Sequence, residues 1–140
     1  MNGSIIKLEV IPIFLSTQSK KREVVAFLDE LQKLLERENF DINTDITLII
    51  KKKQGEDQRY STPYTLLDLD YDIEDVVNRL KELTVEEYSE TKIDTDDVNP
   101  PLLFVFGKDI NGKIIYIKLK IKEISRNMFY AYHFIMQKIK

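Results

Sequence analysis

The sequence predicts an α+β fold, an antiparallel sheet of about four to five strands with two main helices packed on one face. Residues 19–39 carry apolar side chains at helical spacing. Residues 102–122 alternate apolar and polar side chains around an Asn-Gly pair, which is typical of a β-hairpin. The chain has 140 residues and no internal repeat, so we expect residues 1–140 to form a single domain with one hydrophobic core.

The first part of the chain is expected to hold two strands and the longer helix. Residues 5–15 predict a strand, and Pro12 favours an edge position in the sheet. Ser19 is a suitable cap for the helix that follows, and Asn39 is a suitable stop. The apolar stripe of this helix consists of Val24, Phe27, Leu28, Leu31, Leu34 and Leu35. Residues 46–53 are rich in β-branched side chains and predict the second strand.

A second helix is expected at residues 73–83, after a polar loop at residues 54–63. Asp72 can cap this helix, and Asp75 stands three residues later, which is the spacing of a capping box. Thr84 would cap a further short helical turn in the stretch "VEEYSE".

The last part of the chain predicts three neighbouring antiparallel strands. Residues 102–110 and 113–122 flank Asn111-Gly112, the strongest short hairpin signal, and residues 128–136 form the last strand. With a two-residue turn, the apolar side chains of both hairpin strands share one face of the sheet.

The other face of the hairpin would carry a row of polar side chains toward solvent. In this register Tyr116 lies opposite Gly107, which leaves space beside the tyrosine ring, and Lys118 lies opposite Val105. Lys120 continues the row. A basic strand face with an accessible aromatic ring could bind the phosphates and bases of a nucleic acid.

The composition excludes several classes of site. The chain has no cysteine, which excludes a disulfide framework, a thiolate nucleophile and a cysteine-bound zinc. His133 is the single imidazole, and neither a calcium-loop spacing nor a glycine-rich phosphate loop is present, so we expect no metal and no cofactor. No apolar run approaches the ~20 residues of a membrane helix. We therefore expect a cytoplasmic protein that has no membrane partner.

The net charge of −3 conceals two segments of opposite charge. Residues 56–99 hold fourteen acidic and four basic side chains, whereas residues 108–140 hold eight basic and two acidic ones. Segregated charge of this kind can create a local field that attracts an anion. The alternative interpretation is that the two segments simply pack against each other.

Tyrosine, lysine and histidine remain as candidates for chemistry, and they suit the metal-free cleavage of RNA. In this reaction the ribose 2′-hydroxyl attacks its own phosphate, which requires a base, stabilisation of the phosphorane anion, and an acid for the leaving 5′-oxygen. Ammonium groups supply the electrostatic stabilisation, and a histidine can transfer protons near pH 7. Each residue also has a structural interpretation: Tyr116 as an amphipathic sheet residue, Lys120 as an edge lysine, and His133 as a core imidazole.

The stretch "FVFGKDINGKIIYIKLKI", followed by a strand that contains "YHF", resembles the MqsR-type toxins, which are mRNA interferases with a RelE-like fold. The similarity spans residues 20–140 and is strongest from 65 to 134. It implies that residues 19–140 form a toxin-like domain with a RelE-like fold. Residues 1–18 lie outside the resemblance, and we expect them to be an N-terminal strand extension. The resemblance also implies a metal-independent endoribonuclease that cleaves mRNA and is neutralised by a cognate antitoxin protein.

The resemblance implies roles for individual residues. Tyr116 matches the strand tyrosine of the family, which would orient the scissile phosphate or assist proton transfer. Lys118 matches the following lysine, which would stabilise the phosphorane, and His133 matches the histidine that would act as general acid or base. The residues expected to bind RNA phosphates are Lys108, Lys113 and Lys120.

The alternative function is a non-catalytic interaction or regulatory module with a RelE-like fold, that is, a degenerate toxin homologue. The acidic residues 56–99 could bind a basic partner or mask the basic strands. The C-terminal "IMQKIK" also departs from the usual ending of the family. The two hypotheses differ in whether the protein cleaves RNA.

Overall fold

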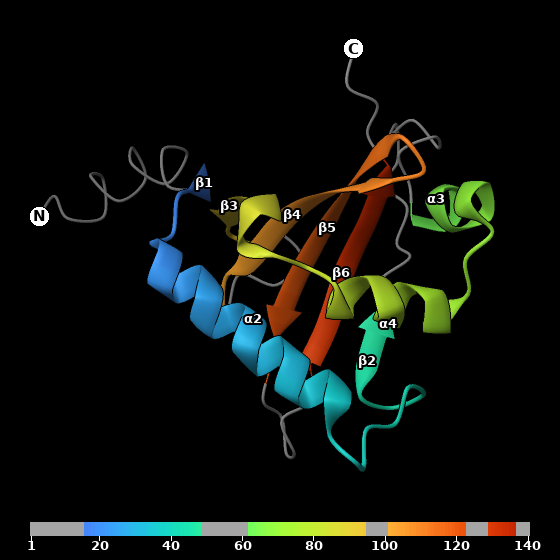
Figure 1. Ribbon diagram of the computed structural model, residues 1–140, viewed down its shortest axis with the longest axis horizontal. Helices are drawn as coiled ribbons and strands as arrows, with labels where there is room; N and C mark the ends of the chain where they lie inside the picture. The colour runs from blue at the N-terminus through green and yellow to red at the C-terminus, as the bar shows by residue number, and fades with distance from the viewer. Residues whose placement is uncertain (1–15, 49–61, 95–100, 123–128, 137–140) are drawn as a thin grey trace, which may run out of the picture.

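The computed structural model describes residues 16–48, 62–94, 101–122 and 129–136 (Figure 1). The strand expected at residues 5–15 lies outside these residues, and so does the part of the second strand that follows Leu48.

The described strands form one mixed sheet, in the order β1-β3-β4-β5-β6-β2. The strands are β1 (Ser16–Thr17), β2 (Ile46–Leu48), β3 (Tyr88–Lys92), β4 (Leu103–Ile110), β5 (Lys113–Ile121) and β6 (Phe129–Met136). β1, β3, β4, β5 and β6 pair antiparallel in turn, whereas β2 pairs parallel to β6 at the other edge. Together with the helices this confirms the expected α+β class, with four longer antiparallel strands at its centre.

The β4–β5 hairpin has the register that the Asn-Gly turn predicts. Asn111 and Gly112 have φ values of 55° and 81°, and positive φ at both central positions is the geometry of the tight turns that suit hairpins. Tyr116 pairs with Gly107, and Lys118 pairs with Val105, as expected. The turn therefore sets which side chains of β5 share a face with the helices.

The first described helix, α2 (Lys21–Glu36), is shorter at both ends than the sequence predicts. Ser19 does not cap it, because its backbone N–H donates to the Tyr88 hydroxyl at 2.9 Å and its own hydroxyl lies 2.7 Å from that of Thr91. The chain at Ser19 is thus tied to β3, and the helix begins after it. The buried residues of α2 are Val24, Leu28, Leu31, Leu34 and Leu35, as expected from their spacing.

The middle of the chain forms α4 (Ile73–Lys81), which begins at the expected capping box of Asp72 and Asp75. The preceding helix α3 (Thr62–Leu69), which contacts β6, is not expected from the sequence. The stretch "VEEYSE" was expected to be a helical turn throughout. Only Val85–Glu87 forms one, a 3₁₀ turn (η3), and β3 starts at Tyr88 because that residue pairs with Phe106 of β4.

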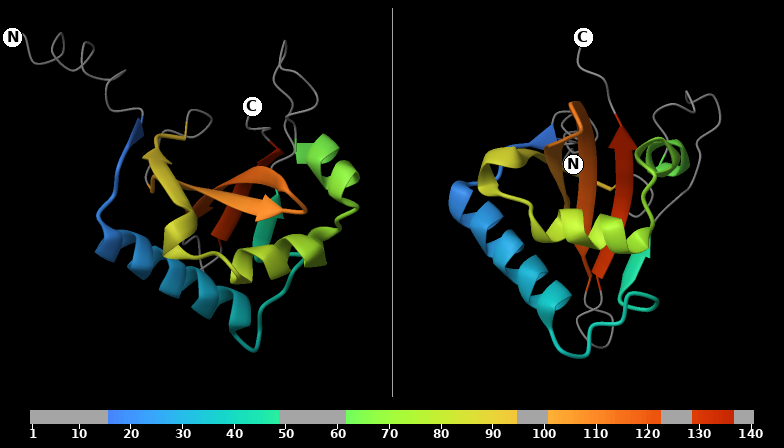
Figure 2. Two further views of the ribbon diagram at one scale, coloured as in Figure 1. Left: turned by 45° about the horizontal axis from the view of Figure 1, so that its top comes forward. Right: turned by 45° about the vertical axis from the view of Figure 1, so that its right-hand side comes forward.

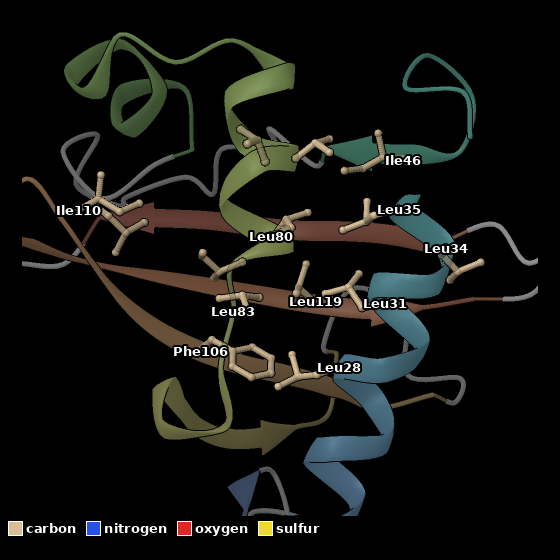
Figure 3. Close-up of a cluster of buried hydrophobic side chains, with 14 of the residues drawn as sticks. Leu28, Leu31, Leu34, Leu35, Ile46, Leu80, Leu83, Phe106, Ile110 and Leu119 are labelled. Atoms are coloured by element: carbon tan, nitrogen blue, oxygen red, sulfur yellow. The ribbon is translucent and has the colours of Figure 1, made fainter. Parts of the chain in front are cut away.

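The core lies between one face of the sheet and the helices α2 and α4, which cross that face (Figure 2). Figure 3 shows side chains of both helices, such as Leu31 and Leu80, gathered with Phe106 and Leu119 of the strands. Each large apolar side chain that is fully buried in this way stabilises the fold by about 1.5–3 kcal/mol relative to an exposed one. The side chains that alternate with these along each strand therefore lie on the opposite face of the sheet.

Candidate functional site

Tyr116 and Lys118 lie on the sheet face that the helices do not cover. Ile115, Ile117 and Leu119 alternate with them along β5 and belong to the core, so the pleat sends the two polar side chains the other way. Both are half-buried.

The ring of Tyr116 lies against Gly107. A Cβ atom added at Gly107 would lie 3.3 Å from Cε1 of Tyr116, which is tighter than ordinary contact. The sequence predicts open space beside the ring, but in the structure the ring itself fills that space. The glycine thus lets the aromatic side chain pack close to the backbone of β4.

The three candidate catalytic residues occupy neighbouring positions in the sheet, with Lys118 between the other two. The Cα partner of Lys118 on β6 is His133, and Tyr116 stands two residues away on the same strand. Residues directly opposite each other on antiparallel strands have Cβ atoms about 4.5–5.5 Å apart. The backbone therefore brings the positions of Tyr116, Lys118 and His133 together.

A β-bulge in β6 produces the pairing of Lys118 with His133. Lys118 pairs with His133 but Leu119 pairs with Ala131, so Tyr132 is an extra residue on β6. In an unbroken continuation of the Leu119–Ala131 register, His133 would pair with Ile117, a position on the helix side. This bulge was not expected from the sequence, because no local signal in "YAYHF" distinguishes a bulged strand from a regular one.

Lys120 was expected to continue the open row of β5, and the structure shows otherwise. Its side chain is 0% exposed, and Nζ lies 3.2 Å from the Asp94 carboxylate, which is 2% exposed. Its strand neighbours on that face, Leu103 and Val105 of β4, are buried as well. The expectation of a solvent-facing row therefore fails at Lys120, whose charge is satisfied inside the protein.

The two other lysines expected to bind RNA lie on the helix side of the hairpin. Lys108 donates to the Glu87 carboxylate at 3.0 Å and to the backbone oxygen of Glu82 at 3.5 Å. Lys113 forms an ion pair with Asp68 of α3. These two lysines are separated by the sheet from Tyr116 and Lys118, so the structure does not gather the six candidate residues into one site.

The acidic and basic segments of the sequence are therefore joined through specific ion pairs. Asp68, Glu87 and Asp94 all belong to the acidic stretch, and each meets a different lysine of the hairpin. This agrees with the interpretation that the two segments pack against each other. Within the described residues, Tyr116 and Lys118 remain on the face away from two of these pairs.

Comparison with known proteins gives no relative. Neither protein-family models, nor curated proteins, nor solved structures match this chain. Among the residues that the structure describes, no three His, Cys, Asp or Glu side chains gather in a way that could hold a metal ion. No helix in the described part of the chain has the length and apolar character needed to cross a membrane.

Proposed function

We propose that the protein is a metal-independent endoribonuclease toxin with a RelE-like fold that cleaves mRNA in the cytoplasm and is neutralised by a cognate antitoxin. The observation that carries the proposal is the register between β5 and β6, in which Lys118 pairs with His133 and Tyr116 stands on the same strand. The three residue types match the three needs of RNA cleavage without a metal.

Each residue has a role in the proposed reaction. His133 exchanges a proton with the 2′-hydroxyl or with the leaving 5′-oxygen, and Lys118 stabilises the negative charge of the phosphorane. Tyr116 orients the scissile phosphate and assists the other of these two proton transfers. The 2′-oxygen forms a bond to phosphorus while the bond to the 5′-oxygen breaks, which leaves a 2′,3′-cyclic phosphate and a 5′-hydroxyl.

The expected RNA contacts need revision within this proposal. Lys120 has no access to a phosphate, because its side chain is fully buried against Asp94. Lys113 is 39% exposed, and its pair with Asp68 is of the weak surface kind, so an RNA phosphate could replace that carboxylate. The proposed site therefore depends on Tyr116, Lys118 and His133, and the hairpin lysines have at most a secondary part.

A second candidate is the non-catalytic interaction module. It is favoured by one observation, namely that Lys108, Lys113 and Lys120 all have carboxylate partners from the same chain. A protein that uses its lysines internally has less positive charge to offer to RNA. In this case the fold would persist without the activity.

The test is an RNA cleavage assay with the full chain, purified without antitoxin, in the presence of EDTA. We expect products that end in a 2′,3′-cyclic phosphate, and we expect Tyr116→Phe and Lys118→Ala to lower the rate at least about 100-fold, as for the loss of a group that acts in the transition state. Lys33→Ala, which removes an exposed lysine from α2, is the matched control and should retain the rate. Wild-type rates in both Tyr116→Phe and Lys118→Ala would eliminate the enzyme, and intact RNA with the wild-type chain would favour the module.

A further inference from the structure

An open groove of about 590 Å³ lies between α4 and the loop that follows α2, and neither proposed function uses it. Its size is within the range of about 300–1,000 Å³ that is usual for ligand sites. One wall is residues 39–42 of the loop, and the other is the outer side of α4. It thus belongs to the helix side of the molecule, whereas Tyr116 and Lys118 lie on the opposite face of the sheet.

Both walls of the groove are held in place by polar contacts. In the loop, the Asp45 carboxylate accepts a hydrogen bond from the Asp41 backbone N–H at 2.9 Å and pairs with Arg37 at 2.7 Å. In α4, Asp72 and Asp75 form the reciprocal capping box. The groove is therefore a formed feature of the fold, with little to reorganise when a ligand binds.

The groove is lined by both apolar side chains and carboxamide groups. Phe40, Ile42 and Val77 supply apolar surface that packs on the core. Asn39 on the loop and Asn78 on α4 are exposed, and their carboxamides make no hydrogen bond within the described part of the chain. A carboxamide offers both a donor and an acceptor, which matches the N–H and C=O of a peptide unit.

Charge along the groove is also uneven. Glu74 stands in the first turn of α4 and Asp41 on the loop, whereas Lys81 stands in the last turn of α4. The carboxylates oppose the binding of a phosphate chain and favour a cation. Glu74 and Lys81 are seven residues apart, about 10 Å along the helix, which is the length of about three extended residues.

We propose that this groove binds a short extended segment of a protein partner that carries a lysine or arginine beside an apolar residue. The basic side chain meets Glu74 and Asp41, the apolar side chain covers Phe40 and Val77, and the carboxamides hold the peptide backbone. An acidic residue or a terminal carboxylate of the segment meets Lys81. The proposal does not depend on whether the opposite face cleaves RNA.

The experiment is a selection of phage-displayed random twelve-residue peptides against the full chain. We expect enrichment of peptides that combine lysine or arginine with an apolar residue. The affinity of a selected peptide, measured by fluorescence anisotropy, should fall about tenfold, or 1.4 kcal/mol, in Glu74→Gln and in Asn78→Ala. Glu30→Gln, which removes an exposed carboxylate from α2, is the matched control and should bind normally.

Three results would overturn the proposal. The first is a selection that yields acidic peptides or no enriched sequence. The second is an affinity that Glu74→Gln and Asn78→Ala leave unchanged, or that Glu30→Gln lowers equally. The third is self-association of the wild-type chain that Glu74→Gln abolishes in sedimentation velocity, because the groove would then be occupied by a second copy. Thermal unfolding of each variant shows whether it is folded under the conditions of the assay.

Discussion

The buried pair of Lys120 and Asp94 shows how one residue can change the interpretation of a strand. The alternation of β5 correctly predicts the face on which Lys120 lies, since it follows from the pleat alone. Whether Lys120 is open to solvent depends on a residue that is distant in the sequence, because its partner Asp94 stands twenty-six residues earlier in the chain. No local pattern contains that information, so the burial of Lys120 could not be predicted.

Removal of the buried carboxylate should be much more costly than removal of an exposed one. We expect Asp94→Ala to lower the free energy of unfolding by about 3–5 kcal/mol, because it removes the Asp94 carboxylate from beside an ammonium group that is fully buried. Asp68→Ala removes the partner of the half-exposed Lys113 and should cost about 1 kcal/mol or less. Urea unfolding measures both, and equal losses in the two variants would contradict this account of Lys120.

At the scale of the elements, the sequence predicts well what local periodicity and turn chemistry decide. The helix α2, the capping box of α4, the β4–β5 hairpin and the last strand β6 all follow from such signals. Two features that the sequence did not predict depend instead on how strands distant in the sequence pair with one another. β3 begins directly after a 3₁₀ turn because Tyr88 has a partner on β4, and the bulge at Tyr132 depends on how β6 pairs with β5.

The conformation of the loop after α2 can be tested through the Asp45 carboxylate, which binds Arg37 and the Asp41 backbone N–H. A hydrogen bond from the Asp41 backbone N–H and, next to it, one from the Arg37 side chain lower the pKa of Asp45 from its usual value of 3.8. A lowered pKa in the folded state means that Asp45 stabilises the fold above pH 3.8, and that this stabilisation is lost as the pH falls through the lower folded value.

We therefore expect the difference in unfolding free energy between wild type and Asp45→Asn to be largest at neutral pH and to shrink in acid. Urea unfolding of both proteins at a series of pH values from about 7 to about 2 measures this difference. The exposed Asp29→Asn on α2 is the control. A difference between wild type and Asp45→Asn that stays constant over this range would show that the carboxylate charge does not hold the loop.

For the whole molecule, the segregation of charge noticed in the sequence has a structural explanation. The acidic middle of the chain contributes α3, η3 and the residues after β3, and from each of these one carboxylate binds a lysine of the hairpin. The pair of Lys113 with Asp68 is partly exposed and therefore weak, so an external phosphate could compete for Lys113, whereas Lys120 is fixed in its fully buried pair with Asp94. The candidate site thus comprises fewer residues than the sequence predicts.

The central claim is that the positions of Tyr116, Lys118 and His133 form one site for an RNA phosphate. The measurement that tests it most directly is the NMR signal of the imidazole, because the chain has one histidine. An RNA oligonucleotide with 2′-deoxy substitutions cannot be cleaved by attack of the 2′-oxygen, and its binding should shift this signal and raise the pKa of His133, since a nearby anion favours the protonated ring. Lys118→Ala should remove the effect. An imidazole signal and a pKa that stay unchanged at saturating oligonucleotide would contradict the claim.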